Sequence, residues 1–395
     1  MRREPEALSA ALAGLAAAER MRRRRVIERV AGGGTEGARV IVEGRALVDF
    51  CSNDYLGLAR HPEVIAALAP AAVAFGAGSG AAHLVSGHSA HHHALEEELA
   101  AFTGRERALL FSTGYMANLG TIGAFAGRGE TVLEDRLNHA SLLDGARLSG
   151  ARLLRYAHGD AAAAQRLLAE RGDVALLATD GVFSMDGDLA PLAALAAPCE
   201  RARAWLLVDD AHGLGVLGPG GRGSVAAAQL DAAAVPLLVG TLGKAFGTFG
   251  AFVAGGRDTI EFLLQQARTY IYTTALPPAV AAATRVALRL AAAEEWRRAR
   301  LLELVARFRA AAAAAGLALT ASPTPIQPLI VGAPATALHL SAALAERGFW
   351  VTAIRPPTVP DGTARLRITL SALHRDVEVD ALVAALAELV AAGPH

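Results

Sequence analysis

Lys244 is the only lysine in this chain of 395 residues, so every other residue among the 38 Lys and Arg is an arginine. It lies in the glycine-rich stretch VGTLGKAFGTFG, residues 239–250, which continues the apolar run VPLLVG. An arginine side chain is always charged, whereas a desolvated lysine can lose its proton and act as a nucleophile. Keeping one lysine here therefore indicates a chemical role, such as a Schiff base with an aldehyde.

Polar residues follow several short apolar runs of the sequence. The runs ETVLED, VALLATD, AWLLVDD and VPLLVG are predicted to be strands of a parallel sheet, whose ligands bind at the carboxyl ends of the strands. A single Asp or His at such an end is most often a cap or a satisfied polar group, but the whole set together indicates a site. The set comprises Asn138, His139, Thr179, Asp180, Ser184, Asp209, His212, Thr241 and Lys244.

These residue types suit pyridoxal phosphate (PLP), which carries an aldehyde and a pyridine ring that acts as an electron sink. Asp209 is predicted to pair with the pyridine nitrogen, because a buried carboxylate favours the protonated ring. His212 and Ser184 are placed to reach the ring hydroxyl, and His139 or Tyr115 to stack on the ring. For the phosphate we expect Thr241 and the backbone N–H groups of residues 112–118, STGYMAN, which are predicted to open a helix.

Three other patterns are weaker guides to function. GLGVLG, residues 213–218, matches G-x-G-x-x-G, but DDAH separates it from the strand and PGGRG cannot open a helix, which disfavours a nicotinamide site. GTLGKAF lacks the spacing of a P-loop and has Ala245 where Ser or Thr should follow the lysine. His88, His91, His92, His93 and Glu96 form a cluster, but adjacent residues of a helix point in different directions, so we predict no metal site.

The predicted elements are those of an α/β protein with a large, mostly parallel sheet and a smaller α+β domain after it. Residues 1–45 are expected to form an N-terminal helical and hairpin segment, 46–280 the large domain, and 281–395 the small C-terminal domain. Within these, Ala- and Leu-rich composition predicts one helix over 6–30 and one long helix over 278–315.

The composition excludes several classes of protein. Lys+Arg and Asp+Glu are both 38, so a neutral chain is not expected to bind nucleic acid or an anionic membrane. Hydrophobic residues make up 53%, enough for a large core. Two cysteines form no disulfide framework, and no signal peptide or run long enough to span a bilayer is visible, so we expect a cytoplasmic protein.

Several motifs together resemble the α-oxoamine synthase family of PLP enzymes. DDAHG at 209–213 followed by TLGK at 241–244 is the most specific, and NDYLGL, NHASLLDG and FSMDGDLAPL match as well. The match extends from about Met21 to the C-terminal helix. The resemblance implies the aspartate-aminotransferase-like fold (fold type I) and an obligate homodimer with active sites at the subunit interface.

The resemblance also implies a role for each matching residue. Lys244, His139, Asp209 and His212 would be catalytic, with Lys244 holding the cofactor and then removing the Cα proton of the amino acid. Arg367 would hold the amino-acid carboxylate, Arg22 and Arg355 would lie nearer the acyl substrate, and Asn53 near the reacting amino acid. The residues implied to bind the cofactor are Ser112, Gly114, Tyr115, His139, Asp180, Ser184, Asp209, His212, Thr241, Lys244, Thr273 and Thr274, with Thr273 or Thr274 reaching the partner subunit's phosphate.

The segment AIRPPTVPDGTARLRITLSALH, residues 353–374, most resembles the family members of biotin biosynthesis. It implies condensation of L-alanine with pimeloyl-CoA or a pimeloyl carrier protein, with loss of CO2. A glycine C-acetyltransferase or 5-aminolevulinate-synthase-like activity stays open as an alternative, and a PLP lyase or aminotransferase as a remote one. Asp180 stands where the family has glutamate, and His83 lies where the family varies.

Overall fold

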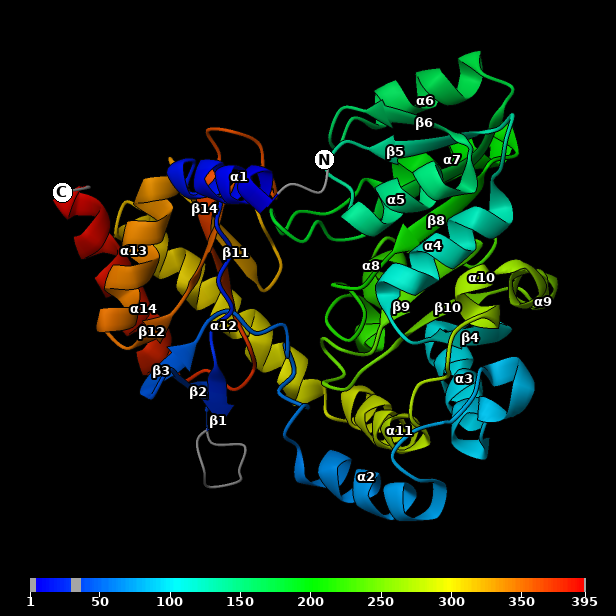
Figure 1. The fold of residues 1–395 in the computed structure, drawn as a ribbon, viewed down its shortest axis with the longest axis horizontal. Helices are drawn as coiled ribbons and strands as arrows, with labels where there is room; N and C mark the ends of the chain where they lie inside the picture. Colours follow the sequence, from blue (N-terminus) through cyan, green and yellow to red (C-terminus); the bar gives the residue numbers. More distant parts are fainter. Residues whose placement is uncertain (1–4, 30–36, 394–395) are drawn as a thin grey trace. The chain divides into compact units, whose positions relative to one another are not determined.

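The computed structural model describes residues 5–29 and 37–393 (Figure 1). It consists of two compact units. Unit 1 comprises Met1–Ser52, Met185–Gly187 and Leu301–His395, and unit 2 comprises Asn53–Ser184 and Asp188–Arg300.

Unit 2 is built on a seven-stranded sheet with the strand order β4-β10-β9-β8-β7-β5-β6 (Figure 1). Only β10 runs against its neighbours β4 and β9, so the prediction of a large, mostly parallel sheet is confirmed. The strands are β4 (Arg107–Phe111), β5 (Thr131–Asp135), β6 (Arg152–Tyr156), β7 (Val174–Asp180), β8 (Trp205–Asp209), β9 (Leu237–Thr241) and β10 (Ala251–Gly255).

Helices cover both faces of this sheet. The alternation of side chains along the strands sends Leu176 and Leu207 into a core with Ile122 of α4, and Leu177 and Leu206 into a second core with Leu195 of α7. The helices of the unit are α2 (Pro62–Phe75), η1 (His83–Gly87), α3 (Ala90–Thr103), α4 (Gly114–Phe125), α5 (Ala140–Ser149), α6 (Ala161–Glu170), α7 (Leu192–Ala202), η2 (Pro219–Gly221), α8 (Gly223–Ala227), α9 (Arg257–Gln266), α10 (Arg268–Ile271) and α11 (Pro278–Ala293).

Unit 1 contains two smaller sheets, with the strand orders β1-β2-β3-β12 and β11-β14-β13. Their strands are β1 (Ile27–Arg29), β2 (Arg39–Val42), β3 (Arg45–Asp49), β11 (Ile326–Gly332), β12 (Phe349–Trp350), β13 (Thr352–Ile354) and β14 (Ala364–Thr369). The helices are α1 (Pro5–Ala17), α13 (Pro334–Glu346), α14 (Asp376–Ala392) and most of α12 (Glu295–Ala314). No helix among the described residues is both long and apolar enough to cross a membrane.

Two predicted helices are wrong in extent. The helix expected over 6–30 ends at Ala17, Glu19 adopts a positive φ of 54°, and Ile27 pairs with Val42 in a strand. Pairing with β2 gives this segment hydrogen-bond partners that override its local helix propensity. The helix expected over 278–315 is two helices, because Glu294 leaves the helical conformation at ψ 68°.

The two units divide the chain at points other than the predicted boundaries of 45/46 and 280/281. The N-terminal segment groups with the C-terminal region because β3 pairs with β12. Helix α11 groups with unit 2 because it packs against α2 and α3. Both regroupings arise from contacts between segments far apart in the sequence.

Candidate active site

A chain of hydrogen bonds leads from Lys244 through His212, which follows β8, to the loop that carries Tyr55 and Asn53. Lys244 Nζ lies 2.8 Å from His212 Nε2, and His212 Nδ1 lies 2.7 Å from the hydroxyl of Tyr55. The Tyr55 hydroxyl donates to Asn53 Oδ1 at 3.2 Å. With that donor used, Tyr55 accepts from Nδ1–H, which leaves Nε2 as the acceptor for the lysine. Tyr55 thereby sets the tautomer of His212.

The turn that carries Lys244 is fixed by glycine. Gly247 has a φ of +66°, and a Cβ atom on it would lie 2.2 Å from the backbone nitrogen of Ala59. Only glycine avoids both the strain and the overlap. Thr248 N–H donates to Leu242 O at 2.9 Å and closes the turn after β9. The NDYLGL motif and the lysine turn are thus packed together, which explains how Tyr55 reaches His212.

Asp209, the last residue of β8, is held by a second network. Its Oδ2 accepts from Asn118 Nδ2 at 2.6 Å, and its Oδ1 accepts from the backbone N–H of Ala211 at 3.1 Å. Asn118 Nδ2 also donates to Ser141 Oγ at 2.8 Å, and that hydroxyl lies 2.7 Å from His139 Nδ1. Asn118 and Ser141 are fully buried. The network therefore orients the aspartate and the histidine together.

Asp180, the last residue of β7, lies beside Asp209 in the parallel register and accepts from the backbone N–H of His139 at 2.7 Å. Burial and the neighbouring Asp209 carboxylate raise the pKa of Asp180 well above its ordinary value. Burial lowers the pKa of His139, an effect that the nearby Lys244 charge reinforces and the Asp209 charge opposes. A neutral imidazole at the start of α5 is suited to stacking on an aromatic ring.

The adjacent carboxylate, Asp210, faces a different environment. It is fully buried, and its Oδ2 accepts from Ser224 N–H at 2.7 Å. Cβ atoms on Gly181, Gly213 and Gly223 would lie 2.7, 2.0 and 2.0 Å from its oxygens. Three glycines therefore make room for this side chain, which organises the loop after β8. Burial raises the pKa of Asp210 to about 7.

We expect Asp210 to make the protein less stable as the pH rises. Between about pH 4 and 7 the folded protein retains this proton while the unfolded chain has released it, so the free energy of unfolding falls with rising pH, by on the order of 1 to 4 kcal/mol. Asp210→Asn should reduce the difference between urea unfolding curves at pH 5 and pH 8. Glu200→Gln, on the surface of α7, is the control, and an unchanged difference in Asp210→Asn would contradict the assignment.

The predicted phosphate end lies at the start of α4. Thr113 caps this helix by accepting from Met116 N–H at 3.2 Å, and a Cβ atom on Gly114 would meet nothing within 4 Å. A helix N-terminus that opens onto such space suits a phosphate, because its first N–H groups point out of the helix. Three of the other residues predicted to bind the cofactor make hydrogen bonds within the protein: Ser112 Oγ donates to Thr274 O at 3.1 Å, the Tyr115 hydroxyl bonds to Asp144, and Thr241 Oγ1 donates to Gly250 O at 3.2 Å. Thr273 and Ser184 are half-buried.

The three arginines predicted to bind substrate lie in unit 1. Arg367 is buried on β14, where its register partners are Pro328 and Thr352. Arg355 bonds to the backbone carbonyls of Glu19 and Met21, and Arg22 is exposed with Nη2 3.5 Å from Thr358 Oγ1. Their roles stay predictions.

The histidine cluster is engaged in local contacts. His92 Nε2 bonds to Leu276 O at 2.7 Å, and His92 Nδ1 accepts from Ser89 N–H at 3.0 Å. One ring nitrogen each of His83, His88 and His92 lies within 4.8 Å of the others, close enough for a shared metal ion. However, His83 Nδ1 and His88 Nδ1 lie 3.0 Å apart and contact each other. His92 therefore serves as a cap that ties α3 to the segment before α11.

The described residues fit PLP. The only lysine, Asp209 and His139 converge at the carboxyl ends of neighbouring strands, and α4 offers an open helix N-terminus. Asn118 Oδ1 is buried with no partner, which leaves a polar atom beside the predicted ring position. Asp209 would hold the ring nitrogen and α4 the phosphate.

Sequence reasoning did not assign Tyr55, Asn118 or Ser141. Each lies inside a motif that was used for the resemblance or the helix start: Tyr55 in NDYLGL, Asn118 at the end of STGYMAN and Ser141 in NHASLLDG. A motif that identifies a family or marks the start of a helix can therefore also supply a side chain to the site.

Tyr55→Phe is expected to lower kcat by about 10- to 100-fold, because the buried Nδ1–H of His212 loses its acceptor. The rate should be measured at saturating substrates to separate it from binding. Tyr270→Phe is the control, since Tyr270 is equally buried and stacks on His83. A Tyr55→Phe rate within twofold of the wild type would show that the tautomer of His212 is set elsewhere.

Comparison with known proteins gives consistent matches. The model of the aminotransferase class I and II family matches residues 45–386. The 8-amino-7-oxononanoate synthase of Methylococcus capsulatus is 62% identical over 97% of this chain and 98% of its own. Among solved structures, Sphingomonas wittichii serine palmitoyltransferase has a TM-score of 0.91 at 32% identity, covering 98% of this chain and 97% of its own. The 8-amino-7-oxononanoate synthase of Francisella tularensis has a TM-score of 0.78 at 30% identity, covering 88% and 98%.

Proposed function

Because the chain belongs to the class I and II aminotransferase family and, within it, to the α-oxoamine synthases of the 8-amino-7-oxononanoate synthase type, we propose that it condenses L-alanine with a pimeloyl thioester. The products are 8-amino-7-oxononanoate, CO2 and the free thiol of CoA or of a carrier protein. The observation that carries the proposal is the convergence of the only lysine with His212 and Asp209 at one edge of the sheet.

PLP, when bound, supplies an electron sink for the negative charge left on the alanine Cα. When PLP is bound, Lys244 would hold it covalently and would then be the base that takes the Cα proton, with Nζ lying 2.8 Å from His212 Nε2. Asp209 would favour a protonated ring nitrogen, and Asn118 keeps the Asp209 carboxylate oriented. His139 would stack on the ring, because Ser141 holds its Nδ1 and its backbone N–H donates to Asp180.

The substrate groups are assigned to the remaining predicted residues. Arg367 pairs with the alanine carboxylate, since the guanidinium fork matches a carboxylate with two parallel hydrogen bonds. Asn53 lies near the amino acid, and Arg22 and Arg355 near the acyl chain. These four assignments rest on the resemblance at matching positions.

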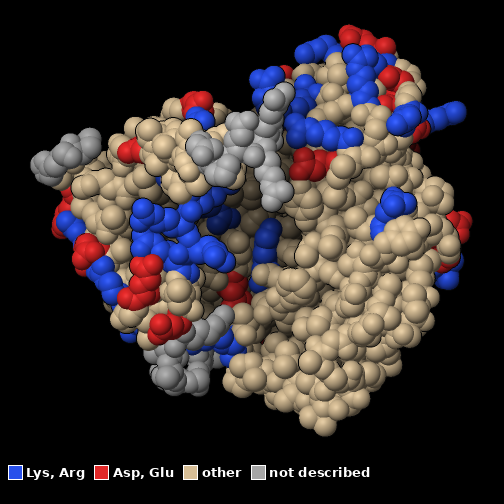
Figure 2. All heavy atoms as spheres, in the orientation of Figure 1, with Lys and Arg blue, Asp and Glu red and all other residues tan. Residues whose placement is uncertain are grey.

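We also propose a homodimer, located in the cytoplasm. The support for the dimer is a set of exposed apolar side chains on unit 2, on α2, on η1 and in the segment after α10. Val73 is 89% exposed, Val85 79% and Tyr272 70%. Figure 2 shows few charged side chains on the face over α2 and α11. Apolar surfaces of this kind mark protein–protein contacts.

The test is the visible absorption of the purified protein while L-alanine, glycine and L-serine are added in turn, with pimeloyl-CoA last. A cofactor band that responds best to L-alanine, followed by thiol release on adding pimeloyl-CoA, is the expected result. A response to glycine alone would favour the acetyltransferase or aminolevulinate alternative. A colourless protein that PLP cannot reconstitute would overturn the proposal.

A further inference from the structure

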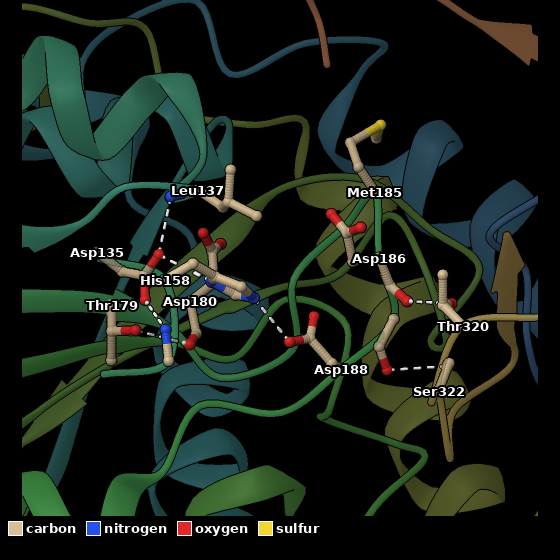
Figure 3. Close-up of polar contacts among 12 residues, drawn as sticks. Asp135, Leu137, His158, Thr179, Asp180, Met185, Asp186, Asp188, Thr320 and Ser322 are labelled. Atoms are coloured by element: carbon tan, nitrogen blue, oxygen red, sulfur yellow. Dashed lines mark hydrogen bonds and ion pairs between the residues drawn. The ribbon is translucent and has the colours of Figure 1, made fainter. Parts of the chain in front are cut away.

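His158, between β6 and α6, forms an ionic bridge with two aspartates that lies outside the residues assigned above. Its Nδ1 lies 3.0 Å from Asp135 Oδ1 and its Nε2 lies 2.8 Å from Asp188 Oδ2 (Figure 3). We call Asp135, His158 and Asp188 the His158 bridge.

The hydrogen-bond pattern assigns a positive charge to this histidine. An ionised carboxylate only accepts hydrogen bonds, so two carboxylates facing both ring nitrogens require both nitrogens to be donors. Asp135 is 1% exposed, and its two oxygens also accept from the backbone N–H groups of Leu137 and Gly159, each at 2.8 Å. Consistent with this, the hydrogen bonds to Asp135 and Asp188 raise the pKa of His158 to about 10.

Asp188 lies near the end of the loop Gly181–Ala190, which begins at the predicted active site. The loop leaves β7 after Asp180, and its two halves then run antiparallel. Val182 and Leu189 form an isolated β-bridge, and Phe183 N–H donates to Asp188 O at 3.0 Å. Ser184 is the next residue after Phe183. Ser184 therefore directly follows the residue whose backbone N–H bonds to Asp188, the aspartate that His158 holds.

His158 contacts both sides of this loop. Its ring lies edge-on to the ring of Phe183, with centroids 4.5 Å apart at 89°, while Nε2 holds Asp188. Asp135, the last residue of β5, anchors the other end of the bridge to the sheet. The bridge thus links the loop that carries Ser184 to Asp135 at the end of β5. Asp135 is two residues before Leu137 and four residues before His139.

We propose that His158 is a positioning residue. As a cation between Asp135 and Asp188, it fixes the loop Gly181–Ala190. The fixed loop then holds Ser184 against the ring hydroxyl of the cofactor. The proposal rests on the proposed function, which gives Ser184 that role. A neutral side chain cannot replace it, because two carboxylates would then face each other with no cation between them.

The test compares His158→Gln with Asp188→Asn, which breaks the same bridge from the loop side. Both should increase hydrogen exchange in the peptide spanning 182–189 by roughly tenfold, the effect of losing one charged hydrogen bond. Both should also shift the pH midpoint of the cofactor's visible band in the direction produced by Ser184→Ala. Arg171→Gln is the matched control, since Arg171 pairs with Asp173 at 2.8 Å and is 26% exposed against 28% for His158.

Two results would overturn the proposal. Hydrogen exchange in the peptide spanning 182–189 could stay as in the wild type in both variants, even with a lower melting temperature, which would show that the bridge does not fix the loop. Exchange could rise while the band stays unchanged, which would show that Ser184 is positioned by other contacts. Failure of the proposed function is distinguishable, because the wild-type protein itself would then bind no PLP.

Discussion

Lys244→Ala is expected to lower turnover by at least about a thousandfold, because it removes both the covalent anchor of the cofactor and the base that takes the Cα proton. No other lysine of the chain can substitute for it. Lys244→Arg is the matched variant, since it keeps a positive charge near His212 Nε2 but cannot lose a proton. Both variants should be inactive in an assay of thiol release from pimeloyl-CoA with L-alanine.

The single lysine makes a direct chemical test possible. Reduction of the wild-type protein with borohydride in the presence of PLP should attach one cofactor, seen in the intact mass and mapped to residues 239–250. Neither Lys244 variant should carry the label there. More than a tenth of the wild-type rate in Lys244→Ala, or a label mapped elsewhere in the wild type, would contradict the role given to Lys244.

Asp209→Asn is expected to lower kcat by about 10- to 1000-fold, which corresponds to losing one opposite charge beside the ring nitrogen. The amide would also conflict with its surroundings. Asp209 accepts two N–H groups, from Asn118 and Ala211, and an asparagine would place its own NH2 against one of these donors. The affinity for PLP should fall less than kcat, because the phosphate and Lys244 still hold the cofactor.

Asp210→Asn is the control for Asp209→Asn, since it removes a carboxylate at the next residue in an equally buried position. Asp210 bonds to Ser224 rather than to the network of Asn118, so the variant should keep kcat within about threefold. Both variants should be assayed for kcat and for PLP dissociation. An equal loss of kcat in the two would show that burial of charge, rather than contact with the ring nitrogen, is what the site requires.

Much of the site was predictable because the residues lie at the ends of neighbouring parallel strands. Local apolar runs located β7, β8 and β9, and the register then places Asp180 beside Asp209 and Asp209 beside Val239. In such a sheet all carboxyl ends meet at one edge. The resemblance carried by DDAHG and TLGK added the cofactor, and the fold class it implied is confirmed.

The sequence thus determined the kind of fold and the cofactor and predicted residues that hold it, while the contacts that support those residues came only from the tertiary structure. Tyr55 bonds to His212 across 157 residues and Asn118 to Asp209 across 91. Likewise, Ile27–Arg29 became a strand through pairing with β2 although its surroundings favour a helix. Periodicity and motifs report on neighbours within a few residues, whereas partners brought together by packing of distant segments leave no such local signal.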